Sequence, residues 1–186
     1  MKVIIAIIFV LAIPLFSQKS YPKQQIGLGY SFYSGSGISY QIEFNPTYAL
    51  KTNGFIYYYG DDLPDVVDIF PNLGFEIQRN IYKNPNSRLY ALAGTSYWYF
   101  ESRTKDVKFE NDMEIITKKV DIDEIYNFGL GMGIEHKFIN SFSISLDLGL
   151  HYQISGITNF SPFFDRNPKG TDFIGIGGSL GFRYNF

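Results

Sequence analysis

The sequence predicts an all-β fold, an eight-stranded antiparallel up-and-down transmembrane β-barrel preceded by an N-terminal signal peptide. Large apolar residues alternate with small or polar ones in about eight separate segments, which is the period-2 pattern of amphipathic strands. Short and long connections alternate between these segments, as in barrels whose two ends face different compartments. Aromatic residues make up 18% of the chain beside 18 glycines, a composition that suits such strands better than helices.

The N-terminus has the layout of a secretory signal. A short positive region, Met1-Lys2, is followed by an almost wholly apolar stretch from Val3 to Phe16, interrupted by Pro14. Roughly 14 apolar residues are too few for a spanning helix, which needs about 20. We expect cleavage near residues 17–19, which divides the chain into a signal peptide (1–18) and a barrel domain (19–186). An uncleaved membrane anchor is the alternative.

Composition excludes several classes of protein. The chain has no cysteine, so neither a disulfide framework nor a thiolate metal site is available. Sixteen basic residues face 18 acidic ones, a near balance that argues against a nucleic-acid partner. No segment after the signal stays apolar for the length of a membrane helix, so a helical membrane protein is not expected.

The eight strands are predicted at residues 24–34, 37–45, 48–59, 70–82, 88–103, 124–138, 141–154 and 173–186. The seventh alternates most regularly, with apolar positions from Phe142 to Ile154 separated by Ser143, Ser145, Asp147, Gly149, His151 and Gln153. The fifth is aromatic and less regular, and its apolar positions are Tyr90, Leu92, Trp98 and Phe100.

Tight turns are expected at 45–47, 83–87 and 139–141, and longer links at 60–69, 104–123 and 155–172, with a compact turn at 34–36. Within 104–123, Val107, Phe109, Val120 and Ile122 keep a period of two, so this link is predicted to be a hairpin that turns near Asn111-Asp112. Its strand edges are candidates for pairing with an extracellular partner. The 156–172 loop carries a candidate contact surface of clustered phenylalanines, Phe160, Phe163 and Phe164.

The final strand places Leu180, Phe182, Tyr184 and the terminal Phe186 on one face, with Ser179, Gly181, Arg183 and Asn185 between them. In this respect the chain resembles the small eight-stranded bacterial outer-membrane β-barrels of the OmpA/OmpX-like family. The resemblance implies location in the outer membrane of a Gram-negative bacterium, in contact with its lipid. It also implies that these four residues form an assembly signal for the barrel-assembly machinery.

In such a barrel the polar row faces the lumen, where we expect Glu43, Lys51, Glu76, Glu135, Lys137, Asp147, His151 and Arg183. Eight strands leave room for little beyond side chains, and buried charges must pair. A plugged polar lumen and a structural or surface-interaction (adhesin-like) role are therefore predicted. The alternatives are a narrow ion or solute channel and a soluble lipocalin-like binding barrel with its apolar row inside.

An enzyme is not expected, although some outer-membrane barrels modify lipid A. The chain has two histidines, His136 and His151. Barrel deacylases carry a His-x-Ser arrangement, whereas the second residue after His151 is Gln153. Ser155 lies about 13 Å further along an extended strand, too far for a direct hydrogen bond. No catalytic residue, cofactor or metal site is predicted, and a lipid-modifying enzyme remains the alternative.

Overall fold

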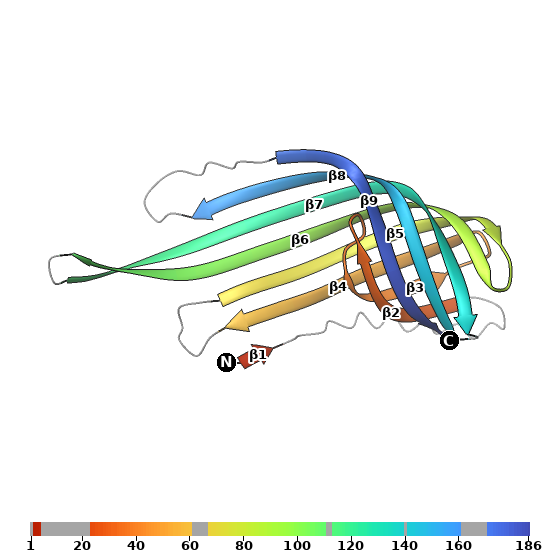
Figure 1. The fold of residues 1–186 in the computed structure, drawn as a ribbon, viewed down its shortest axis with the longest axis horizontal. Coiled ribbons are helices and arrows are strands. Elements are labelled where there is room, and N and C mark those ends of the chain that lie inside the picture. The colour runs from red at the N-terminus through yellow and green to blue at the C-terminus, as the bar shows by residue number, and fades with distance from the viewer. Residues whose placement is uncertain (1, 5–22, 61–66, 111–112, 140, 161–170) are drawn as a thin grey trace.

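The computed structural model describes residues 2–4, 23–60, 67–110, 113–139, 141–160 and 171–186. These residues form nine strands, shown in Figure 1: β1 (Lys2–Ile4), β2 (Lys23–Ser31), β3 (Gly37–Glu43), β4 (Tyr48–Gly60), β5 (Val67–Lys83), β6 (Ser87–Glu110), β7 (Met113–Ile139), β8 (Phe142–Phe160) and β9 (Thr171–Asn185).

Strands β2 to β9 form one closed ring. Each pairs antiparallel with the next, and β9 returns to pair with β2 from Gln25↔Asn185 to Ser31↔Ser179. All eight predicted strands are therefore present, in the predicted up-and-down order. The short β1 lies against the edge of β4 and belongs to the predicted signal peptide, whose other residues lie outside the described ones. The described part of the chain contains no helix long and apolar enough to cross a membrane.

The ring is apolar outside and polar inside. On β8, the side chains of Ser143, Ser145 and Asp147 are buried in the lumen, whereas those of the intervening residues are exposed. The same alternation gives an exterior of large exposed apolar residues, among them Leu28, Ile77, Leu130, Leu148, Ile176 and Leu180. A soluble barrel would have the opposite arrangement, so that alternative is wrong and the fold is a transmembrane β-barrel.

Asparagine side chains shape two of the three short turns. The Asn45 Oδ1 accepts hydrogen bonds from the backbone N–H groups of Thr47 (2.8 Å) and Tyr48 (2.9 Å). The Asn84 Oδ1 accepts them in the same way from Asn86 (2.9 Å) and Ser87 (2.6 Å). An asparagine that bonds the backbone two and three residues ahead favours a tight reversal, which explains why the chain turns at these points.

The strands differ greatly in length at the opposite end of the barrel. β3 has 7 residues and β2 has 9, whereas β6 has 24 and β7 has 27. β6 and β7 pair without interruption from Ser87↔His136 to Glu110↔Met113, so most of the link predicted at 104–123 is a two-stranded hairpin. The hairpin prediction is confirmed by this ladder, whereas the predicted turn residues Asn111-Asp112 lie outside the described residues.

The orientation of the fifth predicted strand needs a correction. The apolar positions singled out from the sequence do not form its lipid-facing row: Tyr90 and Leu92 are buried, on the same row as Ser96, in the lumen. Trp98 pairs with the inward-facing Asn72 and therefore also faces the lumen. Aromatic residues occupy both rows of this strand, including Tyr97 and Tyr99 on the outside, so alternation alone could not orient it.

The turn between β2 and β3 folds into the lumen instead of projecting outward. Tyr33 and Ser34 are fully buried, and Gly35 adopts a positive φ of 75°. The turn crosses to the far wall, where glycines of β5 and β7 make room for it. A Cβ at Gly74 would overlap the Ser34 carbonyl oxygen, and one at Gly129 would overlap the Tyr33 Cβ.

This close approach predicts the effect of Gly74→Ala. The added methyl group would collide with the backbone of the turn, and relief requires displacement of the turn, so we expect a loss of about 1–3 kcal/mol of stability. This loss of stability is measured by gel electrophoresis of samples heated to increasing temperatures. The readout is the temperature at which the fast-migrating band of the folded barrel converts to the band of the unfolded protein. Gly156→Ala is the matched control, because its added Cβ would meet no atom within 4 Å. Equal melting of both variants would contradict the packing of the turn against β5.

Candidate functional site

The candidate site is the lumen, where three groups of polar side chains lie between the turn and the short-turn end of the barrel. The first is centred on Glu135 of β7, which is buried beside two arginines. Its Oε2 lies 2.7 Å from Arg88 Nη2 and 3.2 Å from Arg183 Nη2. Its Oε1 accepts a hydrogen bond from Gln25 Nε2 at 2.7 Å. β2, β6, β7 and β9 are thereby joined through one carboxylate.

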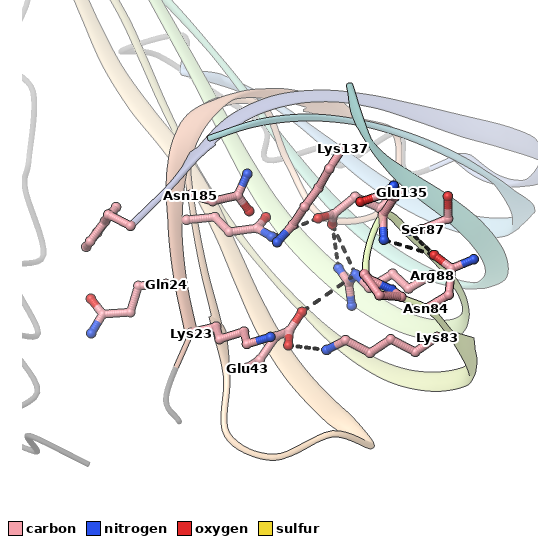
Figure 2. A pocket seen from close by; sticks show the side chains of 14 residues that line it. Lys23, Gln24, Glu43, Lys83, Asn84, Ser87, Arg88, Glu135, Lys137 and Asn185 are labelled. Carbon is pink, nitrogen blue, oxygen red and sulfur yellow. Dashed lines mark hydrogen bonds and ion pairs between the residues drawn. The ribbon is translucent and has the colours of Figure 1, made fainter. Parts of the chain in front are cut away.

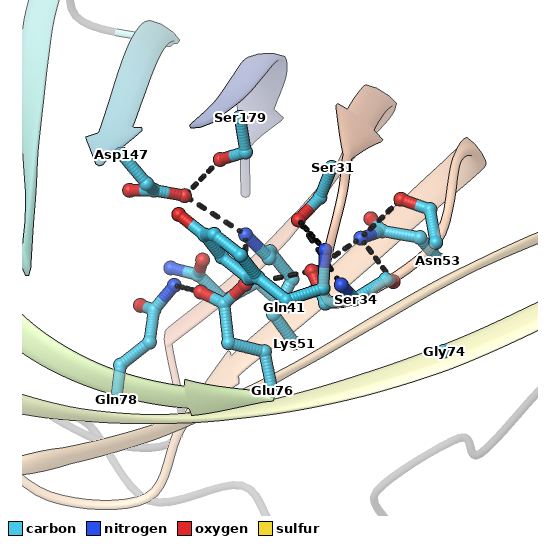
Figure 3. A network of polar contacts seen from close by, with 12 residues as sticks. Ser31, Ser34, Gln41, Lys51, Asn53, Gly74, Glu76, Gln78, Asp147 and Ser179 are labelled. Carbon is cyan, nitrogen blue, oxygen red and sulfur yellow. Dashed lines mark hydrogen bonds and ion pairs between the residues drawn. The ribbon is translucent and has the colours of Figure 1, made fainter. Parts of the chain in front are cut away.

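The second group is centred on Lys51 of β4 and lies beside the turn (Figure 3). The Lys51 Nζ lies 2.7 Å from Glu76 Oε2 and 3.4 Å from Asp147 Oδ2. The Ser34 hydroxyl of the turn donates to Glu76 Oε2 at 2.7 Å. Asp147 also accepts hydrogen bonds from the hydroxyl groups of Tyr90 and Ser179. The turn is thus hydrogen-bonded to the ion pairs beneath it.

The third group lies at the mouth next to the short turns, where Lys83 forms an ion pair with Glu43 (Figure 2). The Arg88 Nε lies 4.0 Å from Glu43 Oε1, which links this pair to the Glu135 group. A cavity of about 280 Å³ opens here, lined by residues that include Lys23, Glu43, Lys83, Glu135 and Lys137.

Asparagines complete the attachment of the turn. The Asn53 Nδ2 donates to the Ser34 carbonyl oxygen at 2.9 Å, and the Asn72 Nδ2 donates to the Ser36 carbonyl oxygen at 2.9 Å. The Asn72 Oδ1 accepts from the Ser36 N–H at 3.2 Å. Because β4 and β5 hold the turn through both of its halves, the polypeptide itself crosses the lumen at this level.

Above the turn, the inward rows of β4, β5 and β6 are mainly aromatic, although Asp123 of β7 lies opposite Phe100 on an inward row. Tyr57, Phe70 and Phe100 form a chain of ring contacts, with centroids 5.7 Å apart for the first pair and 5.2 Å for the second. Trp98 stacks on Phe100 at 6.2 Å. On the other side, the ring of His151 lies between those of Phe32 (5.6 Å) and Phe173 (5.5 Å). The lumen therefore has a charged half and an aromatic half, separated by the turn.

The structure places the predicted lumen residues as follows. Glu43, Lys51, Glu76, Glu135, Asp147 and Arg183 are buried and joined by the ion pairs described above. His151 is buried in the aromatic half, away from these pairs, and its Nδ1 has no hydrogen-bond partner in the described part of the chain. His136 is exposed at the short-turn end, where its Nδ1 lies 2.8 Å from the Ser87 hydroxyl.

Other predicted residues lie elsewhere. Leu180, Phe182, Tyr184 and Phe186 are exposed along the outward row of the last strand and the residue after it. Phe163 and Phe164 lie outside the described residues, and for Phe160 only the backbone at the end of β8 is described. Among the described residues, no group of three or more His, Asp or Glu side chains could hold a metal ion.

Sequence reasoning missed several lumen residues, namely Gln25, Tyr33, Arg88 and Tyr90. Arg88 could have been found from its spacing, because it lies two residues from Tyr90 on the same row of β6. The wrong orientation of that strand concealed it. Tyr33 carries no comparable signal, because its burial depends on glycines of distant strands.

No protein-family model and no curated protein matches the chain, so membership of the OmpA/OmpX-like family stays a prediction. Solved structures similar to it include a major outer membrane protein from Thermus thermophilus, at 13% identity and a TM-score of 0.48, covering 88% of this chain and 98% of that one. The N-terminal β-barrel domain of Pseudomonas aeruginosa OprF matches at 16% identity and a TM-score of 0.36, covering 88% and 96%. Acinetobacter baumannii CarO matches at 12% identity and a TM-score of 0.40, covering 91% and 100%. With its apolar exterior and polar lumen, the present protein is a β-barrel of the outer-membrane type.

The Glu135 group predicts the effect of Glu135→Gln. Removing the carboxylate leaves Arg88 and Arg183 buried without their shared counter-ion, which costs about 3–5 kcal/mol. We expect the unboiled band to convert at a clearly lower temperature. Arg79→Gln, at an exposed position of β5, should leave that temperature nearly unchanged. If Glu135→Gln melts like the wild type, the group does not stabilise the barrel.

Proposed function

We propose that this protein is a structural barrel of the outer membrane that does not conduct and that presents the β6–β7 hairpin at the cell surface for contact with a partner. The uninterrupted β6–β7 ladder carries the surface part of this proposal. The attachment of the β2–β3 turn across the lumen supports the closed barrel.

The hairpin extends well beyond its neighbours. Among the described residues, β5 pairs with β6 only as far as Arg103, and β8 pairs with β7 only as far as Val120. Seven residues of each strand, 104–110 and 113–119, therefore pair only with each other (Figure 1). At ~3.3 Å per residue the projection is about 23 Å long.

A projecting hairpin supplies two strand edges with unpaired backbone groups, to which an extended segment of another protein can add by β-augmentation. Its sequence between 104 and 119 contains equal numbers of lysines and carboxylates. Such a mixed surface gives a partner specific charge positions without a strong overall field.

Deletion of residues 105–118 tests the role of the hairpin. These residues contribute no ladder to β5 or β8, so the shortened barrel should fold and keep its heat-dependent mobility shift. Cells that produce the shortened form should lose the self-aggregation or host-cell adherence conferred by the full-length form. Equal adherence by the two forms, at equal surface amounts, would contradict a role of the hairpin in contact.

Planar-bilayer recording tests the closed lumen. The wild type should show no reproducible single-channel conductance, because the turn and the ion pairs occupy the lumen. The triple variant Ser34→Ala, Asn53→Ala, Asn72→Ala removes the side chains that hold the turn, and we expect it to conduct intermittently. Steady conductance by the wild type would favour the channel alternative.

A further inference from the structure

The wall of the barrel is incomplete in its extracellular half. The β2–β9 ladder ends at Ser31↔Ser179, and the β3–β4 ladder ends at Ile38↔Gly54. β9 continues back to Thr171 and β4 continues to Gly60, but β4 and β9 do not pair with each other in the described part of the chain. On this side of β4, residues 58–60 pair with the short β1, which belongs to the predicted signal peptide. We name the region between residues 55–57 of β4 and 171–177 of β9, which no described strand fills, the lateral gap. Figure 1 shows β2 and β3 ending near mid-length while the other strands run on.

The lateral gap lies at the depth of the bilayer. Beside it, Ile174 and Ile176 of β9 point outward and are 73% and 76% exposed. Large apolar side chains with this exposure belong to the lipid-facing band. The seven residues of β3 span only about 23 Å along their own axis, and with a tilt near 40° they cover less than the ~25 Å height of such a band. The gap therefore opens toward lipid.

Behind the lateral gap lies the aromatic half of the lumen. Phe173 is 55% exposed although it faces inward, so space adjoins it there. Tyr57, Phe70, Trp98 and Phe100 line the wall on the β4–β6 side and are only partly buried. The turn closes this space from below and separates it from the ion pairs.

An apolar pocket of about 280 Å³ lies at the foot of the gap, where β3 ends against β4. Its lining consists of Gly54, Phe55, Ile56, Pro71, Asn72, Leu73 and Tyr97. A Cβ at Gly54 would lie 3.0 Å from the Asn72 carbonyl oxygen and 3.4 Å from a Leu73 methyl group. Most of these residues belong to the outward row, so the pocket joins the lipid side to the edge of the gap.

The gap also presents polar groups. In the described part of the chain, residues 55–57 of β4 and 171–177 of β9 have no ladder partner on the sides that face each other. Unpaired backbone N–H and C=O groups of a strand edge are costly in lipid and require a partner. The buried His151 Nδ1, between the rings of Phe32 and Phe173, is a further polar atom without a hydrogen bond in the described residues. Aromatic walls beside unsatisfied polar edges suit a ligand with an apolar body and one hydrogen-bonding head.

We propose that the lateral gap and the aromatic half of the lumen form a binding site for a single-chain amphiphile, an alkyl chain with one polar head, that enters from the bilayer. An eight-stranded barrel has room for one small ligand at most, which favours a single chain over a two-chain lipid. The alkyl chain packs against the aromatic rings, and the head bonds the exposed strand edge.

Trp98 allows a direct test, because it is the single tryptophan of the chain and lines this site. The folded protein is reconstituted in phosphatidylcholine bilayers and titrated with hexadecanoic acid brominated on its chain, while Trp98 fluorescence is recorded. We expect quenching that saturates and that unbrominated hexadecanoic acid reverses. Phe173→Ala should weaken binding about tenfold, the change that ~1.4 kcal/mol of lost ring contact produces.

Phe128→Ala is the matched control, because Phe128 is similarly exposed but faces lipid on β7, and it should bind as the wild type does. Both variants must show the mobility shift of a folded barrel. Absence of quenching by the brominated acid would overturn the proposal, and so would equal weakening of binding by both variants. In a parallel titration with brominated phosphatidylcholine alone, quenching that rises linearly would also overturn it. A stable dimer whose Trp98 is not quenched would also overturn it, since the gap would then be closed by a second copy.

Discussion

The closure of eight strands into a narrow ring is the constraint on which the other features depend. It buries the side chains of Lys51, Arg88 and Arg183 in a narrow lumen, so each needs a carboxylate within contact distance. Glu76, Glu135 and Asp147 meet this need from β5, β7 and β8. Because the partners come from different strands, the same ion pairs that neutralise the lumen also fix strands to one another across it.

The inward turn follows from the same constraint. A lumen lined by these pairs leaves a space above them that short strands β2 and β3 fill with their own connection. That path requires glycine on the opposite wall, at Gly74 and Gly129, because any side chain there would meet the backbone or ring of the turn. The glycines of the polar row thus have a role that their small size alone did not reveal: they define where the polypeptide crosses.

Period-2 alternation was enough to predict the eight strands, the two faces and the projecting hairpin, since these depend on neighbouring residues along the chain. It failed on β6, because large apolar residues occupy both of its rows, with Tyr90 and Leu92 inside and Leu89 and Tyr97 outside, so either orientation satisfies the pattern. It also gave no indication that Tyr33 is buried. The site shows the same division. Glu135 and Arg183 could be assigned to the lumen from their row. The ion pairs that Glu135 forms with Arg88 and Arg183 depend on registers between strands, which no local pattern contains.

The two halves of the lumen differ in their walls as well as in their contents. Where the wall is complete, the interior is filled by ion pairs; where β2 and β3 have ended, it is mainly aromatic. This correspondence has a physical reason, because ion pairs beside an opening to lipid would lose the surrounding polar groups that make their burial tolerable. Aromatic rings such as Phe173 and Trp98 tolerate contact with either lipid or a ligand. The shortness of two strands therefore sets both the position of the gap and the chemistry of what lies behind it.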